Sequence, residues 1–147
     1  NARYLFVRAE YDYWRAEPQH YGPVFDDSVA PVIDAGQADL VEPDHVITSE
    51  VRLESTPGHT PGHASVRISS DGHIAIITGD MIHHPVQFAH PDLASSADWS
   101  QEMAVATRAE AFTRWADGRI VIGTHFAGRT AGRLEVQGDG WKFNPVE

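Results

Sequence analysis

The chain has 147 residues, of which 41% are hydrophobic, and this suffices for one domain with a core of its own. Its 11 Lys and Arg residues against 21 Asp and Glu give a net charge of −10, which repels phosphate backbones and acidic membrane surfaces. Nucleic acid and membranes are therefore not expected partners, and no apolar run approaches the roughly 18 residues of a membrane span.

The absence of cysteine leaves His, Asp and Glu as the residues that could bind a metal ion. We favour a cytoplasmic location, and an export signal upstream of Asn1 stays open as the alternative.

The N-terminal third predicts mixed structure. Residues 2–7 have the aromatic and β-branched content of a strand, and residues 10–14 begin a short helix. Residues 18–26, rich in Pro, Gly and aromatics, predict an ordered irregular loop. Asp26 or Asp27 is expected to cap a helix that runs to about residue 35, where Gly36 stops it. Residues 38–41 and 45–55 then resemble a hairpin whose turn is 42–44.

The rest of the chain continues this alternation. Residues 64–69 and 73–78 predict two strands joined by a Ser-Asp-Gly turn, the second apolar enough to be buried on both faces. A polar loop (81–96) and a helix from residue 98 or 100 to 116 follow, with one apolar stripe expected at Val105, Ala109, Phe112 and Ala116. A strand at 119–123 and a closing hairpin at 133–143 complete the prediction.

The stretch Thr-Pro-Gly-His-Thr-Pro-Gly-His, residues 56–63, carries the strongest chemical signal. Proline fixes the backbone and glycine permits a sharp turn, so His59 should project from a stiff loop at the end of a strand, as a metal ligand requires. The second Pro-Gly-His fits a supporting role for His63, which would orient the first ligand by a hydrogen bond. The alternative is two turns with surface histidines.

Asp80 and His125 also follow apolar strands. A carboxylate at the end of a buried strand is costly without a partner, so Asp80 is expected to meet a cation, although an ordinary turn aspartate is the alternative. His125 follows Gly123 and Thr124 at the end of another strand. Imidazoles combined with a carboxylate suit Zn²⁺, Mn²⁺ or Fe²⁺.

The order of these motifs resembles the metallo-β-lactamase-fold hydrolases. The Thr-Gly-Asp motif comes 21 residues after His59 (80 − 59), and Gly-Thr-His comes 45 residues later (125 − 80). The resemblance implies that His59 completes one metal site, Asp80 bridges two metals and His125 completes the second site. The family motif H-x-H-x-D-H does not occur in these residues. The resemblance therefore implies an α/β fold, the C-terminal half of an αββα sandwich, as one partial domain over residues 1–147.

Within that superfamily, the chain is most similar to methyl parathion hydrolase-like and acyl-homoserine-lactonase-like enzymes. The similarity is carried by residues 79–92, by Asp98 ahead of a helix with Arg108, and by residues 124–134. His83 stands where many lactonases of this fold have a substrate-contacting Tyr. It could bind substrate oxygen or shuttle protons, or simply belong to a polar loop. Candidate pocket residues, with core packing as the alternative for the aromatic ones, are Trp14, Tyr21, Phe25, His84 and Phe88.

The implied activity is hydrolysis of a small ester, lactone or phosphotriester by a hydroxide that bridges two Zn²⁺ ions and is held by Asp80, with Mn²⁺, Fe²⁺ or Co²⁺ as other metals. Two alternatives stay open: a mononuclear iron enzyme similar to the persulfide dioxygenases, and a catalytically silent module of the same fold. The 147 residues alone are expected to hydrolyse no substrate well, because the H-x-H-x-D-H motif does not occur in them. Whether the complete enzyme is a homodimer stays open.

Overall fold

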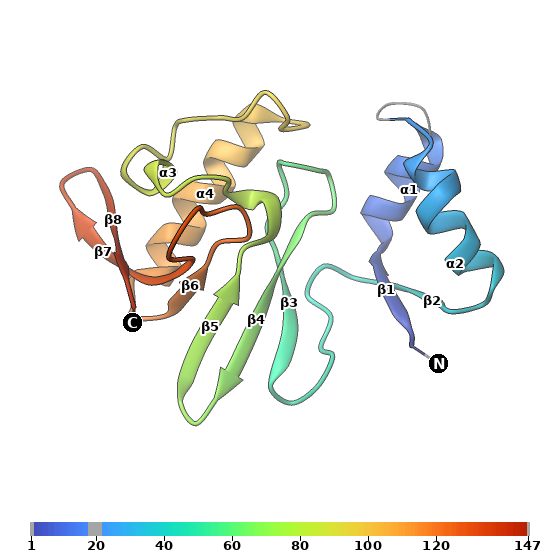
Figure 1. Cartoon of the computed structure of the whole chain (residues 1–147), viewed down its shortest axis with the longest axis horizontal. Coiled ribbons are helices and arrows are strands. Elements are labelled where there is room, and N and C mark those ends of the chain that lie inside the picture. Colours follow the sequence, from blue (N-terminus) through green and yellow to red (C-terminus); the bar gives the residue numbers. More distant parts are fainter. Residues whose placement is uncertain (1, 18–21, 147) are drawn as a thin grey trace.

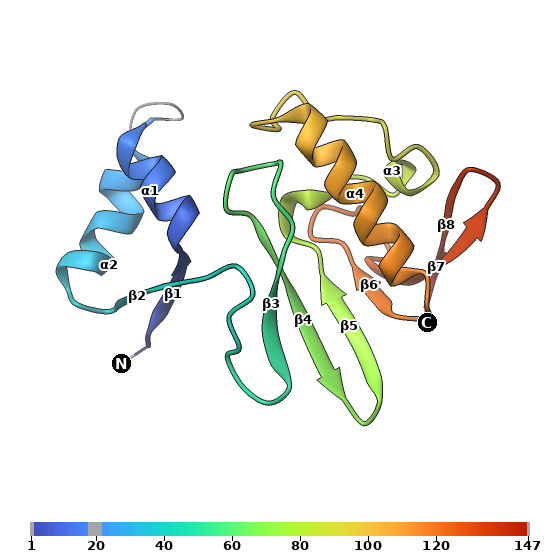
Figure 2. The same cartoon turned by 180° about the vertical axis from the view of Figure 1, so that it is seen from behind.

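A computed structural model describes residues 2–17 and 22–146, which form two β-sheets with flanking helices. The larger sheet is mixed and has the strand order β3-β4-β5-β6-β7-β8, while β1 and β2 form a separate two-stranded sheet. Figure 1 and Figure 2 show the small sheet and its helices to one side of the larger sheet. The molecule thus has the mixed α/β architecture that the sequence predicts.

The N-terminal unit contains β1 (Tyr4–Val7), α1 (Arg8–Ala16), the π-helical turn η1 (Phe25–Val29), α2 (Ala30–Asp34) and β2 (Ala38–Val41). Both predicted helices are present. The second begins at Phe25, so Asp26 and Asp27 lie in its first turn and do not cap it by a side-chain hydrogen bond. Gly36 follows this helix with a φ of 66°, a left-handed conformation that suits glycine and ends the helix as predicted.

The hairpin predicted for residues 38–41 and 45–55 is wrong. β2 pairs in parallel with β1, whereas β3 (Val51–Ser55) pairs with β4 in the other sheet. In the segment that leads into β3, one isolated bridge joins Val46 to Arg52 of that strand, and the Thr48 hydroxyl accepts the N–H groups of Glu50 and Val51. The Glu-Pro-Asp segment therefore leads from one sheet to the other, because β2 pairs with β1, 34 residues earlier in the chain (38 − 4), while β3 pairs with the strand that follows it.

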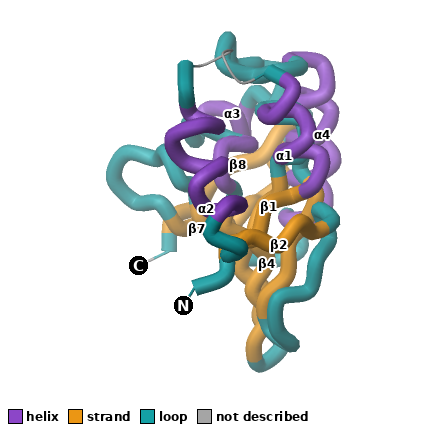
Figure 3. The backbone as a smooth tube through the Cα atoms, turned by 90° about the vertical axis from the view of Figure 1, so that its right-hand side faces the viewer, coloured by secondary structure: helices purple, strands orange, loops and turns teal. Residues whose placement is uncertain are grey.

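The larger sheet follows the predicted order of elements. β4 (Ala64–Ser70) and β5 (His73–Ile77) form an antiparallel hairpin, and so do β7 (Ala131–Gln137) and β8 (Gly140–Pro145). β5 and β6 (Ile120–Ile122) are parallel, joined by a crossover that contains α3 (Val86–Ala89) and α4 (Gln101–Trp115). The carboxyl ends of β5 and β6 therefore lie at one edge of the sheet. Figure 3 shows helices stacked above the strands in the side view.

Helix α4 covers one face of the sheet, where the hydrophobic core lies (Figure 2). It begins after Ser100, whose hydroxyl accepts the N–H of Met103 as an N-cap. Of the predicted stripe, Phe112 is buried and Ala116 packs against the core, whereas Val105 and Ala109 are not among the buried positions, which are Ala104, Arg108, Ala111, Phe112 and Trp115. The face of α4 that points to the core is therefore rotated relative to the predicted stripe. The buried Arg108 lies on this face, and apolar periodicity alone does not predict the burial of a charged residue.

Strand β5 is not buried on both faces. Ile76 points into the core beneath α4 and is fully buried, whereas Ala75 and Ile77 point to the other face and are half-buried. The core cluster draws on α4 and on residues of β5 to β8, with Phe88, Phe112, Trp115 and Val121 fully enclosed. No helix in the described ranges combines the length and apolar character needed to cross a lipid bilayer.

Candidate metal centre

Three loops meet at one edge of the larger sheet. They follow β3, β5 and β6, which all run in the same direction, so their carboxyl ends coincide. The first loop is the Thr-Pro-Gly-His repeat, the second contains the short 3-10 helix η2 (Gly79–Met81), and the third carries His125. Side chains predicted from separate motifs are thereby brought together.

Asp80 lies between the two predicted histidine ligands. Its Oδ1 is 2.7 Å from Nε2 of His125, and its Oδ2 is 3.6 Å from Nε2 of His59. Burial raises the pKa of Asp80, but the hydrogen bond from His125 and nearby imidazoles lower it by more, so the pKa is below its usual value. Asp80 and His125 remain accessible, with side chains 44% and 47% exposed. One carboxylate therefore presents a separate oxygen to each imidazole.

Asp98 holds the other nitrogen of His59. Its Oδ1 is 3.2 Å from Nδ1 of His59, its Oδ2 accepts the N–H of Ser95 at 2.9 Å, and Arg108 lies 3.6 Å away. The side chains of Asp98 and Arg108 are 0% exposed. A carboxylate behind a histidine fixes the tautomer and leaves Nε2 as the free ligand atom.

Sequence reasoning placed Asp98 before a helix but gave it no role. The contact spans 39 residues, so no local spacing announces it. Tyr13 and Trp99, described below, were missed for the same reason. Asp98 is paired with the buried Arg108 of the following helix, but the burial of that arginine is seen only in the structure, so the sequence alone carries no signal for the role of Asp98.

His63 supports the site through Asp80, whereas the sequence predicted that it would orient His59. Its Nε2 accepts the backbone N–H of Asp80 at 2.9 Å. Its Nδ1 therefore carries the proton and can donate to the carbonyl of Thr56 at 3.0 Å. Burial lowers the pKa of His63 by more than Thr56 and Asp80 raise it. A neutral His63 thus ties the first loop to the second.

His83 lies between His59 and His125, with its ring centroid 5.0 Å from the first and 5.1 Å from the second. Its Nδ1 is buried and has no hydrogen-bond partner among the described residues. Burial, followed by the charges of His59 and His125, lowers its pKa. Ligand atoms of His59, His83 and Asp98 also lie within 4.8 Å of one another, a group that could hold a metal ion.

Two glycines let the first loop pack closely. A Cβ at Gly58 would lie 2.4 Å from Cα of Ala104 in α4, and a Cβ at Gly62 would lie 2.5 Å from the backbone nitrogen of Glu10 in α1. The Glu10 carboxylate accepts the N–H of Gly62 and the indole N–H of Trp14, both at 2.7 Å. The histidine loop is therefore clamped between two helices.

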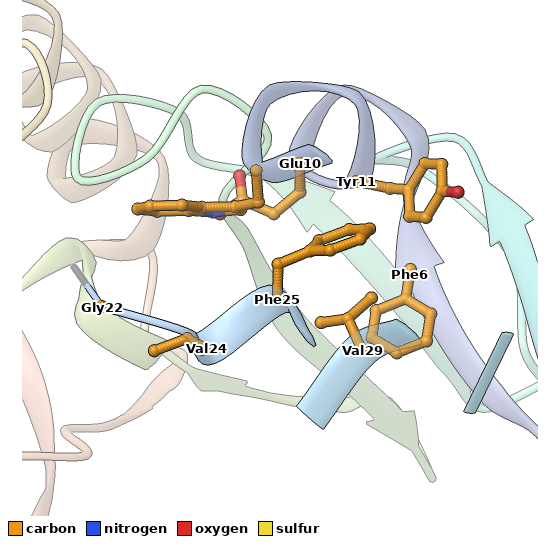
Figure 4. Close-up of a pocket in the computed structure, with 8 residues that line it drawn as sticks. Phe6, Glu10, Tyr11, Gly22, Val24, Phe25 and Val29 are labelled. Atoms are coloured by element: carbon orange, nitrogen blue, oxygen red, sulfur yellow. The ribbon is translucent and has the colours of Figure 1, made fainter. Parts of the chain in front are cut away.

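An aromatic cavity of about 580 Å³ opens beside His59 and Asp98. Tyr13, Trp14 and Trp99 line it, and Tyr13 makes edge contacts with both indoles at 5.0 and 6.0 Å. Trp14 also borders a second, apolar cavity of about 420 Å³. In Figure 4 the Phe25 ring lies at the centre of that cavity, with Glu10 above it and Phe6 and Val29 below.

The other predicted pocket residues have different locations. Phe88 is fully buried in the core, where its ring contacts Phe112, Phe126 and Phe143, so its assignment to a pocket wall is wrong. His84 is exposed and accepts the N–H of Val86, and it borders a cavity between α3 and β8 instead of the aromatic one. Tyr21 lies outside the described residues.

Comparisons with known proteins support this fold. The structure resembles AbOPH, a hydrolase in the β-lactamase superfamily, with a TM-score of 0.88, 24% identity, and coverage of 100% of this chain and 56% of that one. It resembles AidC, a dizinc quorum-quenching lactonase, with a TM-score of 0.78, 21% identity, and coverage of 97% and 54%. It also resembles a variant of AiiA from B. thuringiensis, crystallised with N-decanoyl-L-homoserine. The TM-score is 0.66 and the identity 21%, with coverage of 86% of this chain and 48% of that one.

The chain therefore spans about half the length of the solved structures that it matches. A search of curated protein sequences gives no significant match. The family model of the metallo-beta-lactamase superfamily matches residues 2–133, most of the chain. With the fold and the clustered His and Asp side chains, this match shows that the chain belongs to the metallo-β-lactamase superfamily.

Proposed function

We propose that His59, Asp80 and His125 contribute to a dinuclear zinc centre of a hydrolase that acts on small ester, lactone or phosphotriester substrates. The observation that carries this proposal is the position of Asp80, which presents one oxygen to Nε2 of each histidine. A carboxylate in that position can bridge two cations, one beside each imidazole. The two zinc ions would need further ligands besides His59, Asp80 and His125.

The residues present fit such a centre. His59 has its second nitrogen held by a buried carboxylate, which is the arrangement that orients and strengthens a metal-binding imidazole. We assign Asp98 to this orienting role and not to a metal, because its oxygens already contact His59, Ser95 and Arg108. Asp80 and His125 are exposed enough for a metal and a substrate to reach them.

Bound Zn²⁺ would supply two effects, a lowered pKa of water and polarisation of the scissile carbonyl or phosphoryl group. The chain's own residues would supply orientation. His63 fixes the backbone of Asp80, and Glu10 fixes the loop that carries His59. His83, largely neutral at pH 7 because burial lowers its pKa, would contact a substrate oxygen or accept a proton from it.

The aromatic cavity indicates a substrate with an apolar portion. Tyr13, Trp14 and Trp99 form a wall next to His59, and Trp14 leads to the apolar cavity around Phe25. Such walls contribute binding energy by burying apolar surface. Phenyl esters, acyl lactones and aryl phosphotriesters share this combination of a polar reacting centre and an apolar group.

Metal content and hydrolysis together test this proposal. A protein that also supplies the remaining ligands should bind two zinc ions and hydrolyse phenyl acetate, an acyl-homoserine lactone or paraoxon, whereas the 147 residues alone, in which the H-x-H-x-D-H motif does not occur, should show little turnover. Asp80→Asn should lower kcat/KM by 10²-fold or more, since it weakens the group facing both metals. Asp71→Asn, in an exposed turn, provides the matched control. One bound iron would indicate the mononuclear alternative, and zinc binding that survives both His59→Ala and Asp80→Asn would refute the assignment.

A further inference from the structure

A pocket of about 340 Å³ lies on the α4-covered side of the larger sheet and is lined by three arginines. Arg52 comes from β3, Arg67 from β4 and Arg114 from the last turn of α4. These side chains lie along the strands and the helix end, whereas the metal-facing histidines lie on loops at one edge of the sheet. The chain has only 11 Lys and Arg residues and a net charge of −10, so this gathering of positive charge is unusual for it.

Two of the arginines directly oppose each other. Arg52 and Arg67 are cross-strand partners in the β3-β4 ladder, so their Cβ atoms lie on the same face, about 5 Å apart. Like charges at such a pair destabilise a sheet unless an anion is placed between or above them. Among the described residues, Arg52 donates to the backbone carbonyl of Asp44 at 3.3 Å, and Nε of Arg67 is buried without a hydrogen-bond partner.

Two acidic residues, Asp44 and Glu54, also line the pocket, and among the described residues neither carboxylate forms an ion pair with Arg52 or Arg67. The Glu54 carboxylate accepts from Arg114 and from the indole of Trp115, both at 3.0 Å. Arg114 also pairs with Glu110, which satisfies it from a second side. The donors left over therefore belong to Arg52 and Arg67, and guanidinium groups present their donors in a planar fork that fits the oxygens of an anion.

We propose that this pocket binds a small oxyanion, and that Arg52 and Arg67 are its principal ligands. A phosphate group is favoured over a carboxylate, because its additional oxygens can accept from both opposing forks at once. The site is separate from the metal-facing loops and does not depend on the proposed hydrolase activity. Its occupation would relieve the repulsion between the two strands.

Titration calorimetry with inorganic phosphate tests the site directly. Phosphate is titrated into the chelator-treated protein, with sodium acetate and sodium chloride at equal ionic strength as the other arms. We expect saturable binding of phosphate, weaker binding of acetate and none of chloride. Arg67→Gln and Arg52→Gln should each weaken phosphate binding about tenfold or more, whereas Arg8→Gln, which removes an exposed positive charge elsewhere, should leave it unchanged.

Thermal unfolding separates binding from folding. Without phosphate, Arg67→Gln should be at least as stable as the unmodified protein, since it removes the opposing like charge. Phosphate should raise the Tm of the unmodified protein and of Arg8→Gln, but not that of Arg67→Gln or Arg52→Gln. The proposal is overturned if phosphate shows no saturable binding, or if all four proteins respond to it equally. If acetate binds as tightly as phosphate, the preference for phosphate is wrong.

Discussion

Asp98 contributes both to the orientation of His59 and to the charge balance of the interior. It is fully buried between the imidazole and Arg108, whose guanidinium also donates to the carbonyls of Met81 and Leu93. Asp98→Asn keeps the shape but removes the negative charge beside a buried cation. We expect it to lower stability by about 3 kcal/mol and to weaken zinc binding by about 10- to 100-fold.

Chemical denaturation and zinc titration measure these two effects. Asp92→Asn is the matched control, because Asp92 is exposed in the same loop. A variant that kept its zinc affinity while losing stability would show that Asp98 stabilises the fold without positioning His59.

His63 makes the stability of the metal-free protein depend on pH. Burial lowers its pKa from the ordinary value of 6.5, so below that pH the unfolded chain binds a proton that the folded protein does not. The free energy of unfolding should therefore be highest above about pH 6.5 and fall as the pH decreases. His83, whose pKa is also lowered by burial, acts in the same direction.

Replacing His63 should reduce this dependence. His63→Gln lowers the difference in bound protons between the unfolded and the folded state by up to one. The slope of the unfolding free energy against pH should therefore decrease by about 1.4 kcal/mol per pH unit at most. Urea titrations at several pH values between 5 and 7.5, with a chelator present, give the slope. His73→Gln makes the same substitution at an exposed position and should keep the pH slope of the unmodified protein. An unchanged slope in His63→Gln would mean that the proton is taken up elsewhere.

At the scale of elements, the packing of α4 against the histidine loop depends on Gly58. This glycine has a φ of 136°, and an added Cβ would lie 2.4 Å from Cα of Ala104, so the loop or the helix must move. Gly58→Ala should destabilise the protein by about 3 kcal/mol or more and lower zinc affinity. Gly72→Ala provides the control, since its φ of 77° is also left-handed but its Cβ meets nothing within 4 Å. It should cost only about 1 to 2 kcal/mol. Equal losses of Tm would indicate backbone strain alone.

The predictions from sequence were strongest where the signal is local. The strand pair at residues 64–77, the helix that begins near Ser100 and the hairpin around Gly138 each depend on neighbouring residues, and the structure contains them. The pairing of residues 38–41 with residues 45–55 was wrong, because residues 38–41 pair with residues 4–7, far away in the sequence, and this leaves residues 51–55 to pair with the next strand. For the same reason, the contact between Asp98 and His59 was not predicted, because the two residues are far apart in the sequence. Phe88 was assigned to a pocket because the aromatic residues that surround it in the core come later in the chain.

At the scale of the whole molecule, the N-terminal unit of residues 4–41 is joined to the rest by few contacts. Helices α1 and α2 contain no buried residues, and the core cluster consists of residues from Ile74 onward. The described contacts across this boundary include Glu10 with Gly62 and Tyr13 with Trp99. Both touch the histidine loop or the aromatic cavity, so opening of the N-terminal unit would disturb the site before the core unfolds.

Hydrogen exchange should resolve this difference. Amides of α1 and β2 are expected to exchange through a local opening that costs less free energy than global unfolding, whereas amides of α4, β5 and β6 should exchange only through global unfolding. Glu10→Ala removes the acceptor for Gly62, so it should speed exchange at α1 and at Gly62 without affecting α4. Glu17→Ala, at an exposed position next to α1, is the control. If α1 and α4 show the same opening free energy, the two parts unfold as one cooperative unit, and the contacts across the boundary are stronger than their number indicates.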